Sequence, residues 1–215
     1  MKTFPGIYRI NGKLATLNSS PGYRVYDEKL IYKDGREYRL WDPYRSKLSA
    51  AIIKGLEEFP FRENSNVLYL GASSGTTASH IADICPRGLI YCVEFSKRMM
   101  RELLPVVMKK RNMIPILADA ARPGEYIHRV ASIDIIYQDV AQSNQAEILI
   151  RNSEKFSPRS AMLIIKSRSI NAVKSPKKVF KREMEKLKGK FDILQTIDLR
   201  PYDKDHILVN LRVRK

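Results

Sequence analysis

The sequence has few residues of the kinds that build disulfide scaffolds or metal sites. It contains two cysteines, Cys85 and Cys92, and three histidines in 215 residues. Two cysteines cannot form a disulfide framework or, alone, a structural zinc site, so we expect no metal centre. One cysteine lies late in a predicted helix and the other inside a predicted strand. We therefore interpret both as small core residues.

Long apolar segments are also missing. No apolar run approaches the roughly 20 residues that a transmembrane helix needs. The first five residues, Met1 to Pro5, do not open the apolar stretch of a signal peptide. Hydrophobic residues nevertheless make up 44 % of the chain, which favours a globular protein with a substantial core. We expect an intracellular, cytoplasmic protein with no membrane partner.

Acidic residues are scarce relative to basic ones. The chain has 39 Lys and Arg against 23 Asp and Glu, a net charge of +16. Such an excess favours a polyanionic partner, usually nucleic acid. Between Lys166 and Lys190, ten Lys or Arg against two Glu give +8, half of the excess. This segment is expected to follow an RNA backbone, or in part to form a solvated helix face.

The first 43 residues have the pattern of small β structure. Asn11-Gly12 and Asp34-Gly35 each lie between two strand-like runs, which is a strong signal for hairpin turns. Apolar spacing then predicts a helix from Tyr44 to Glu58. We expect two parts: a small β-hairpin region with its linking helix over residues 1–55, and a larger domain over residues 56–215.

From residue 66 onward, short apolar strands alternate with helices. Strands are predicted at 67–70, 89–94, 114–118, 133–139, 161–166, 191–198 and 207–213, and helices at 76–84, 97–111, 145–156 and 177–187. Apolar strands of this kind indicate a parallel sheet covered on both faces. The connection between the last two strands is too short for a helical crossover, so they should pair antiparallel. The predicted class is α/β, with a seven-stranded Rossmann-like sheet.

The central chemical signal is the small-residue turn after the first strand of this sheet. It runs from Gly71 to Gly75 and leads into a helix opened by Thr76 and Thr77. The two glycines let the backbone turn sharply and a ligand approach closely. Free N–H groups and hydroxyls at the helix start can bind a carboxylate. The segment therefore predicts a ligand-binding turn.

Three classes of protein use such a turn. Dinucleotide enzymes have glycine where Ser73 stands, which weakens that interpretation. The turn also matches the G-x-S-x-G pattern of hydrolases, and Ser73, Asp139 and His206 occur in triad order, but no His-Gly-Gly-Gly oxyanion loop is present. S-adenosylmethionine has no phosphate, so a looser glycine pattern suffices for it.

Acidic residues at the ends of the following strands favour S-adenosylmethionine. Glu94 ends the second strand, about 20 residues beyond the turn, where an acid accepts both ribose hydroxyls. Asp119 follows the third strand and can accept a hydrogen bond from an adenine amino group, and Asp139 ends the fourth. Six parallel-type strands and an antiparallel seventh are the arrangement of S-adenosylmethionine-dependent methyltransferases.

With these residues in hand, the sequence resembles the fibrillarin family over nearly its whole length. The specific stretches are Trp41–Leu48, Gly71–Thr77, Val93–Ser96, Asp139–Gln142 and Pro201–His206. The Gly/Arg-rich N-terminal segment of eukaryotic members is absent, so the chain resembles the archaeal form. Ser143 and Ala121 replace the proline and arginine usual in the family. Both lie next to binding positions, where they bear on substrate contacts and not on the reaction.

The resemblance implies an RNA ribose 2′-O-methyltransferase that uses S-adenosyl-L-methionine. Such proteins are the catalytic subunits of box C/D guide-RNA complexes that act on rRNA and tRNA. The implied partners are the guide and target RNAs, a Nop-family scaffold protein and a kink-turn-binding ribosomal-type protein. The expected cofactor-binding residues are Gly71, Ala72, Ser73, Thr76, Thr77, Glu94, Phe95, Asp119, Ala120, Asp139, Val140, Ala141 and Gln142. Phe95 is expected either to stack on adenine or to pack in the core.

The resemblance also implies a catalytic set. A ribose 2′-hydroxyl is a poor nucleophile, so transfer needs in-line positioning and help in removing the proton. Lys47, Asp139 and Lys166 match the first three places of a Lys-Asp-Lys constellation. We expect Lys166 to accept the proton or orient the hydroxyl, Asp139 to orient the lysine and the methyl donor, and Lys47 to position the hydroxyl or its phosphate. The fourth place falls at Asp205 or His206, and we name His206.

Two alternatives are weighed against this function. The first is a non-catalytic RNA-binding subunit with a vestigial fold, which the joint presence of Lys47, Asp139 and Lys166 disfavours. The second is a hydrolase built on Ser73, Asp139 and His206.

Overall fold

Two glycine turns organise a small N-terminal sheet. The computed structural model describes residues 4–214. Met1 to Thr3 and Lys215 lie outside the described residues, and so does most of the Met1–Pro5 segment that was considered for a signal peptide. The strands are β1 (Tyr8–Ile10), β2 (Lys13–Leu17), β3 (Leu30–Lys33) and β4 (Arg36–Leu40), in the order β1-β2-β4-β3. Asn11, Gly12, Asp34 and Gly35 all have positive φ, as type I′ turns require. Both predicted hairpins are confirmed.

A short helix, α1 (Lys47–Ile53), follows the small sheet. It is shorter at both ends than the predicted helix Tyr44–Glu58. At its start, the Asp42 carboxylate accepts the N–H of Tyr44 and fixes a turn, and the Ser46 hydroxyl caps the helix by accepting the N–H of Ser49. At its end, Gly55 adopts a φ of +96°. Local side-chain hydrogen bonds therefore override the apolar spacing in these flanks.

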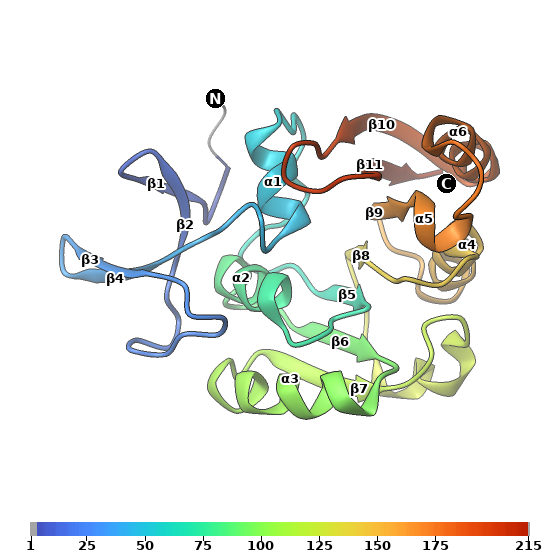
Figure 1. Cartoon of the computed structure of the whole chain (residues 1–215). Coiled ribbons are helices and arrows are strands. Elements are labelled where there is room, and N and C mark those ends of the chain that lie inside the picture. Colours follow the sequence, from blue (N-terminus) through green and yellow to red (C-terminus); the bar gives the residue numbers. More distant parts are fainter. Residues whose placement is uncertain (1–3, 215) are drawn as a thin grey trace.

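Seven strands form the large sheet (Figure 1). They are β5 (Val67–Leu70), β6 (Ile90–Glu94), β7 (Met113–Leu117), β8 (Ile135–Gln138), β9 (Ser160–Lys166), β10 (Phe191–Asp198) and β11 (His206–Val213). The order is β10-β11-β9-β8-β5-β6-β7, and β11 runs antiparallel between β9 and β10. The predicted α/β class and the antiparallel pairing of the last strands are confirmed. The strand order reverses at β5, which makes the β5–β8 junction the topological switch point where ligands bind.

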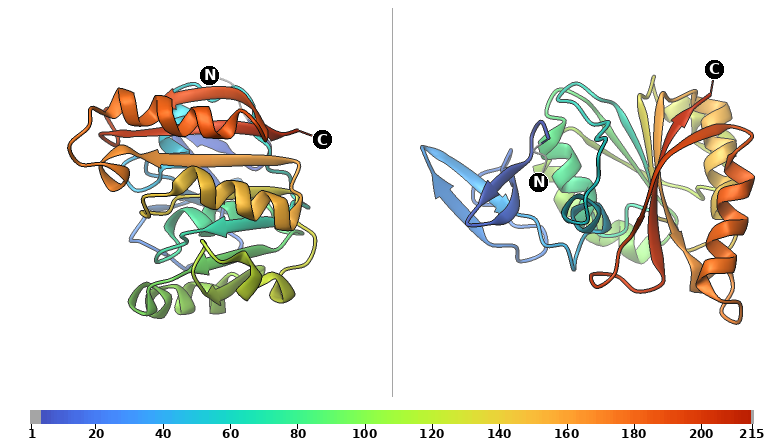
Figure 2. Two further views of the ribbon diagram at one scale, coloured as in Figure 1. Left: turned by 90° about the vertical axis from the view of Figure 1, so that its right-hand side faces the viewer. Right: turned by 90° about the horizontal axis from the view of Figure 1, so that it is seen from above.

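Helices cover both faces of this sheet (Figure 2). One face carries α1, α2 (Thr76–Ile84) and α3 (Lys97–Lys109), and the other carries α4 (Gln145–Phe156) and α6 (Pro176–Leu187). The short helix α5 (Ser167–Ile170) and the 3₁₀ turns η1 (Pro123–Glu125) and η2 (Ile127–Arg129) were not predicted. Along β5, Val67 and Tyr69 enter one core while Leu68 and Leu70 enter the other. Burial on two faces explains why the strands are apolar throughout.

A buried ionic cluster joins the small sheet to α2 and α3. It consists of Glu28, Arg39, Asp83 and Lys110, whose side chains are at most 1 % exposed. Arg39 Nε lies 2.5 Å from Glu28 Oε1 and its Nη1 lies 2.7 Å from Asp83 Oδ2, while Lys110 Nζ lies 2.6 Å from Asp83 Oδ1. Burial, together with Arg39 and Lys110, lowers the pKa of the adjacent His80 well below its usual value, so that ring is neutral. Two cations and two anions therefore balance inside the interface.

The structure also tests the predictions about the two cysteines and about membrane-spanning segments. Cys85 and Cys92 are both buried and free, which confirms them as core residues. Burial raises the pKa of Cys85 to about 12, so its thiol stays protonated and unreactive. Within residues 4–214, no helix is both long and apolar enough to cross a membrane.

Candidate active site

The glycine turn after β5 packs closely under the loop that follows β8. A Cβ on Gly71, whose φ is +82°, would lie 2.8 Å from the carbonyl oxygen of Asp139. A Cβ on Gly75, whose φ is +90°, would lie 2.8 Å from Leu103 Cδ1 on α3. Both positions therefore require glycine for conformation and for space. This packing brings the turn and Asp139 together at the switch point.

Glu94, the last residue of β6, supports the turn from the side. Its Oε2 accepts the N–H of Ser73 at 2.8 Å, and its Oε1 accepts the N–H of Ser96 at 2.8 Å. An ionised carboxylate has about four lone-pair positions, so two hydrogen bonds leave room for two more. Glu94 is 9 % exposed as a residue, and it lines the cavity described next.

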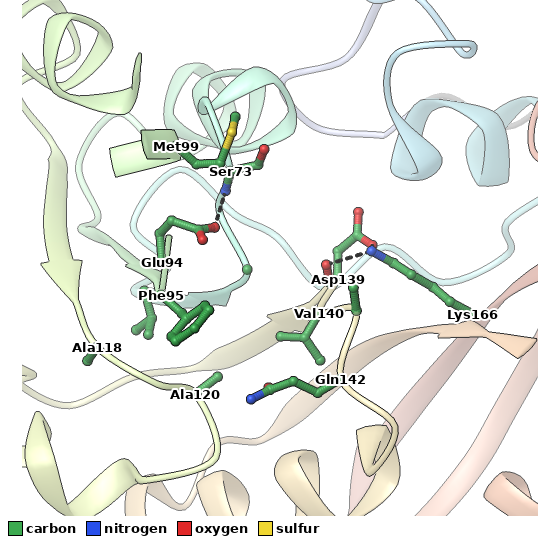
Figure 3. A pocket seen from close by; sticks show the side chains of 13 residues that line it. Ser73, Glu94, Phe95, Met99, Ala118, Ala120, Asp139, Val140, Gln142 and Lys166 are labelled. Atoms are coloured by element: carbon green, nitrogen blue, oxygen red, sulfur yellow. Dashed lines mark hydrogen bonds and ion pairs between the residues drawn. The ribbon is translucent and has the colours of Figure 1, made fainter. Parts of the chain in front are cut away.

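A cavity of about 400 Å³ opens at the carboxyl edge of the sheet (Figure 3). The predicted site residues that line it are Gly71, Ser73, Glu94, Phe95, Ala120, Asp139, Val140, Ala141, Gln142 and Lys166. Phe95 is 74 % exposed at this cavity, which contradicts core packing as its role. The volume lies within the range of small-molecule sites. The predicted residues that line the cavity come from the ends of five different strands, β5 to β9.

Four predicted cofactor residues lie behind or beside the cavity lining. Asp119 accepts a hydrogen bond from the Gln142 side chain at 2.8 Å, which ties it to the lining. The Thr77 hydroxyl donates to Ser46 Oγ at 2.9 Å, so Thr77 presents only backbone N–H at the helix start, beside Thr76. Ala72 is buried within the turn. Val93, Met99 and Ala118 also line the cavity. They were not predicted because apolar side chains carry no chemical signal in the sequence.

Lys47, Asp139, Lys166 and Asp203 form a charged cluster beside the cavity, called here the catalytic edge. Lys47 Nζ lies 3.1 Å from Asp139 Oδ2 and 3.6 Å from Asp203 Oδ2. Lys166 Nζ forms an ion pair with Asp139 Oδ1 at 2.7 Å and donates to the Asp139 carbonyl oxygen at 3.0 Å. Burial alone would lower the pKa of Lys47, but Asp139 and Asp203 raise it, so Lys47 is cationic. The fold thus brings together the three residues predicted for the Lys-Asp-Lys constellation, because Lys47 and Lys166 both contact Asp139.

His206 joins the catalytic edge through Asp203. The His206 Nδ1 hydrogen-bonds the Asp203 carboxylate, and His206 is the cross-strand partner of Lys166. Burial alone would raise the pKa of Asp203, but His206 and Lys47 lower it, so the carboxylate is ionised. Asp205, the other residue named for the fourth place, instead pairs with Arg168. The sequence analysis did not name Asp203 as a site residue, although Asp203 lies in the stretch Pro201–His206, three residues before His206.

The geometry does not support the hydrolase. Asp139 is held by two lysines, and His206 is paired with Asp203. The described hydrogen bond of Ser73 runs from its backbone N–H to Glu94. Because a catalytic triad requires the base to contact both the nucleophile and its acid, residues 4–214 contain no triad of Ser73, Asp139 and His206.

The strand order and the cavity at the switch point define the fold of S-adenosylmethionine-dependent methyltransferases. An S-adenosylmethionine-dependent O-methyltransferase from Thermotoga maritima shares this fold, with a TM-score of 0.55 at 9 % identity over 87 % of this chain and 78 % of that one. Within this class, the Fibrillarin family profile matches residues 1–215. The chain belongs to the Fibrillarin family, as its sequence motifs indicated.

Individual relatives agree over almost the whole chain. A fibrillarin-like rRNA/tRNA 2′-O-methyltransferase of Methanothermobacter thermautotrophicus is 49 % identical over 212 residues, 97 % of this chain and 95 % of the relative. Aeropyrum pernix fibrillarin in complex with natively bound S-adenosyl-L-methionine matches with a TM-score of 0.86 at 48 % identity, over 93 % and 88 % of the two chains. Fibrillarin in a complex with Nop5p matches with a TM-score of 0.91 at 39 % identity, over 100 % of both chains.

Proposed function

We propose that the protein is an S-adenosylmethionine-dependent RNA ribose 2′-O-methyltransferase, the catalytic subunit of a box C/D guide-RNA complex that acts on rRNA and tRNA. The observation that carries the proposal is the meeting of Lys47, Asp139 and Lys166 at the rim of the cavity. Relatives whose sequences are about half identical to this chain are named for this activity. The intact cluster, together with a formed cavity, favours an enzyme over a vestigial RNA-binding subunit.

The cavity residues fit S-adenosylmethionine, which supplies the methyl group. Gly71 and Ser73 line the cavity, so a ligand can approach the turn backbone. Glu94 would accept the ribose hydroxyls, and the exposed Phe95 ring would stack on adenine. Asp119, oriented by Gln142, would accept the adenine amino group. The N–H groups at the start of α2, from Thr76 and Thr77, would bind the carboxylate.

The catalytic edge would orient the ribose hydroxyl and remove its proton. Lys47 and Lys166 are both paired with Asp139, so we assign them as hydrogen-bond donors that position the hydroxyl oxygen. We assign His206 as the proton acceptor, because in the neutral tautomer that donates Nδ1–H to Asp203 the second ring nitrogen, Nε2, is the hydrogen-bond acceptor. Asp203 would act as a positioning residue that holds both His206 and Lys47.

The exposed basic surface around α6 supports RNA binding. Lys174, Lys177, Lys178, Lys181 and Arg182 are all exposed. Lys186 and Lys188, in contrast, pair with glutamates, so this part of the segment is an ordinary solvated helix face. Phosphate contacts from such a surface give affinity without sequence information. We therefore propose that a guide RNA selects the target, that a Nop-family scaffold and a kink-turn-binding protein complete the complex, and that it acts in the cytoplasm.

The experiment is a methyl-transfer assay with radiolabelled S-adenosylmethionine and a target RNA. The protein alone should show no site-specific transfer, whereas addition of scaffold, kink-turn protein and guide should produce one methylated ribose. A guide of changed sequence should move the methylated nucleotide. A Lys166→Ala variant in the same complex is the catalytic control. Efficient marking of one nucleotide by the protein alone, or a site that ignores the guide, contradicts the proposal.

A further inference from the structure

Lys166 lies beyond the point where one of its neighbouring strands ends. β8 ends at Gln138, which pairs with Leu163, so the last three residues of β9 continue past β8. Successive N–H groups of a strand point to alternate sides, and the N–H of Ser167 donates to the Asp205 carbonyl oxygen on the β11 side. The N–H of Lys166 therefore faces the side where β8 has ended, and it needs an acceptor that is not a strand.

Gln145, the first residue of α4, supplies that acceptor. Its side-chain Oε1 accepts the N–H of Lys166 at 2.9 Å. Because a backbone N–H only donates, the atom that faces it must be the oxygen of the side-chain amide. Gln145 is completely buried, so water does not compete for this hydrogen bond. The side-chain amide thus takes the place of the missing strand.

Buried contacts from two other elements hold Gln145 in turn. Gln138 Nε2 donates to the Gln145 carbonyl oxygen at 2.7 Å. The next N–H of α4, from Ala146, donates to the carboxylate of Glu183 on α6 at 3.2 Å. Gln138 and Glu183 are both fully buried, like Gln145 itself. A densely packed acceptor of this kind keeps one position, and it fixes the backbone from which the Lys166 side chain extends.

The other end of Lys166 is held by Asp139. Lys166 Nζ lies 2.7 Å from Asp139 Oδ1 and 3.0 Å from the Asp139 carbonyl oxygen (Figure 3). Asp139 and Gln145 stand at the two ends of the connection between β8 and α4, whose first four residues line the cavity. Gln145 therefore sets the distance between the Lys166 backbone and the loop that carries Asp139.

Packing alone does not explain a glutamine at this position. Within residues 4–214, the buried Nε2 of Gln145 meets no acceptor, so only the oxygen of the amide is used. A buried donor without a partner lowers stability, and an apolar side chain of similar size would avoid that loss. The feature that an apolar residue could not reproduce is the hydrogen bond to Lys166.

We propose that Gln145 is a positioning residue for methyl transfer, which acts by holding the backbone of Lys166 so that Nζ meets the ribose hydroxyl. The inference rests on the proposed function for the role of Lys166. Gln145 is buried behind the cavity lining and does not belong to it, so its effect is on the transfer step and not on binding of the methyl donor.

Four variants test the inference in the complete guide complex. Gln145→Leu and Gln145→Met remove the acceptor and keep a side chain of similar size, whereas Gln145→Glu keeps an acceptor oxygen. Asn210→Leu is the matched control, because Asn210 is 2 % exposed on β11 and donates to the Glu58 carbonyl oxygen at 2.9 Å, away from Lys166. Single-turnover methyl transfer, affinity for S-adenosylmethionine and circular dichroism are measured for each variant. Gln145→Leu is also combined with Lys166→Ala.

Gln145→Leu and Gln145→Met should slow transfer between about tenfold and a hundredfold, since a misplacement of about 1 Å can cost that much. Their affinity for S-adenosylmethionine should stay near wild type. Gln145→Glu and Asn210→Leu should transfer methyl near the wild-type rate. In the Lys166→Ala background, Gln145→Leu should cause no further loss, because two residues that act through one group are not additive.

Four results would each overturn the inference. They are wild-type rates in both variants that lack the acceptor, a Gln145→Glu rate as low as that of Gln145→Leu, the same fractional loss with and without Lys166, and failure of both variants that lack the acceptor to fold. A wild-type complex that binds RNA but transfers no methyl would instead refute the proposed function.

Discussion

The buried ionic cluster and the catalytic edge have nearly the same chemistry and opposite roles. Each joins two basic side chains to two carboxylates across elements that are distant in sequence. In the buried cluster the side chains are at most 1 % exposed, whereas those of the catalytic edge are between 14 % and 29 % exposed. Asp139 and Lys166 also line a cavity. Access to a ligand, and not the presence of ion pairs, separates a site from a structural contact.

The physical reason is the cost of desolvation. A charge inside the protein is tolerated only while its partner remains, so the buried cluster cannot exchange partners without a large loss of stability. Charges at the catalytic edge keep contact with water, so each can exchange a hydrogen bond to its partner for one to another polar group. Substitutions in the two clusters should therefore separate stability from activity.

The largest expected effect is on folding, from Asp83→Ala. This change leaves Arg39 and Lys110 buried without their shared carboxylate. The free energy of unfolding should fall by about 3–5 kcal/mol. Urea denaturation followed by circular dichroism measures it, with Asp139→Asn as the control at the catalytic edge. A loss below about 1 kcal/mol, the level typical of surface ion pairs, would show that the cluster is not a strict structural unit.

Lys166→Ala should reverse this pattern. Single-turnover methyl transfer in the guide complex should slow at least about a hundredfold, because the ribose hydroxyl loses a positioning cation. The Lys166 side chain is 15 % exposed and keeps contact with water, so we expect only a small loss of stability. The affinity for S-adenosylmethionine should stay near wild type. A rate within about tenfold of wild type would remove Lys166 from the catalytic set.

A smaller effect, on binding alone, is expected from Glu94→Ala. The variant loses the carboxylate proposed for the ribose diol and its hydrogen bonds from the N–H groups of Ser73 in the turn and of Ser96 before α3. The binding free energy of S-adenosylmethionine should weaken by about 1.5–3 kcal/mol. Titration calorimetry measures it against Glu102→Ala, an exposed acid on α3. Unchanged affinity in a folded Glu94→Ala protein would refute the assignment.

The smallest effect is a change in the acid dependence of stability. Burial alone would raise the pKa of Glu28, but Arg39 and the N–H groups of Tyr26 and Val25 lower it. A carboxyl with a lowered folded pKa contributes stability above its unfolded pKa, about 4.3, and loses it as the pH falls toward the folded value. Glu28→Gln should therefore show a shallower loss of stability below about pH 4.3 than wild type. Identical slopes would contradict this role for Glu28.

Local sequence signals predicted most of the elements. The bounds of β5, β10, α2 and α4 agree with the predictions because apolar runs, caps and turns all act within a few residues. The predicted helix started before α1 does, because Asp42 and Ser46 form side-chain hydrogen bonds that apolar spacing does not reveal. The glycine turn was predicted because Gly71 and Gly75 follow a strand directly, and Glu94 was predicted because it ends the next strand; Gly71 and Glu94 line the cavity.

The sequence by itself determined the α/β fold, the glycine turn and the acids at the strand ends, since each depends on neighbours along the chain. Only the tertiary structure decided which charged residues are buried and which are accessible. Arg39 and Lys110 look like ordinary surface residues in the sequence, yet both are enclosed, and Asp203 becomes part of the catalytic edge only because β11 lies beside β9. Burial and long-range pairing depend on how separate elements pack, and no local pattern encodes that packing.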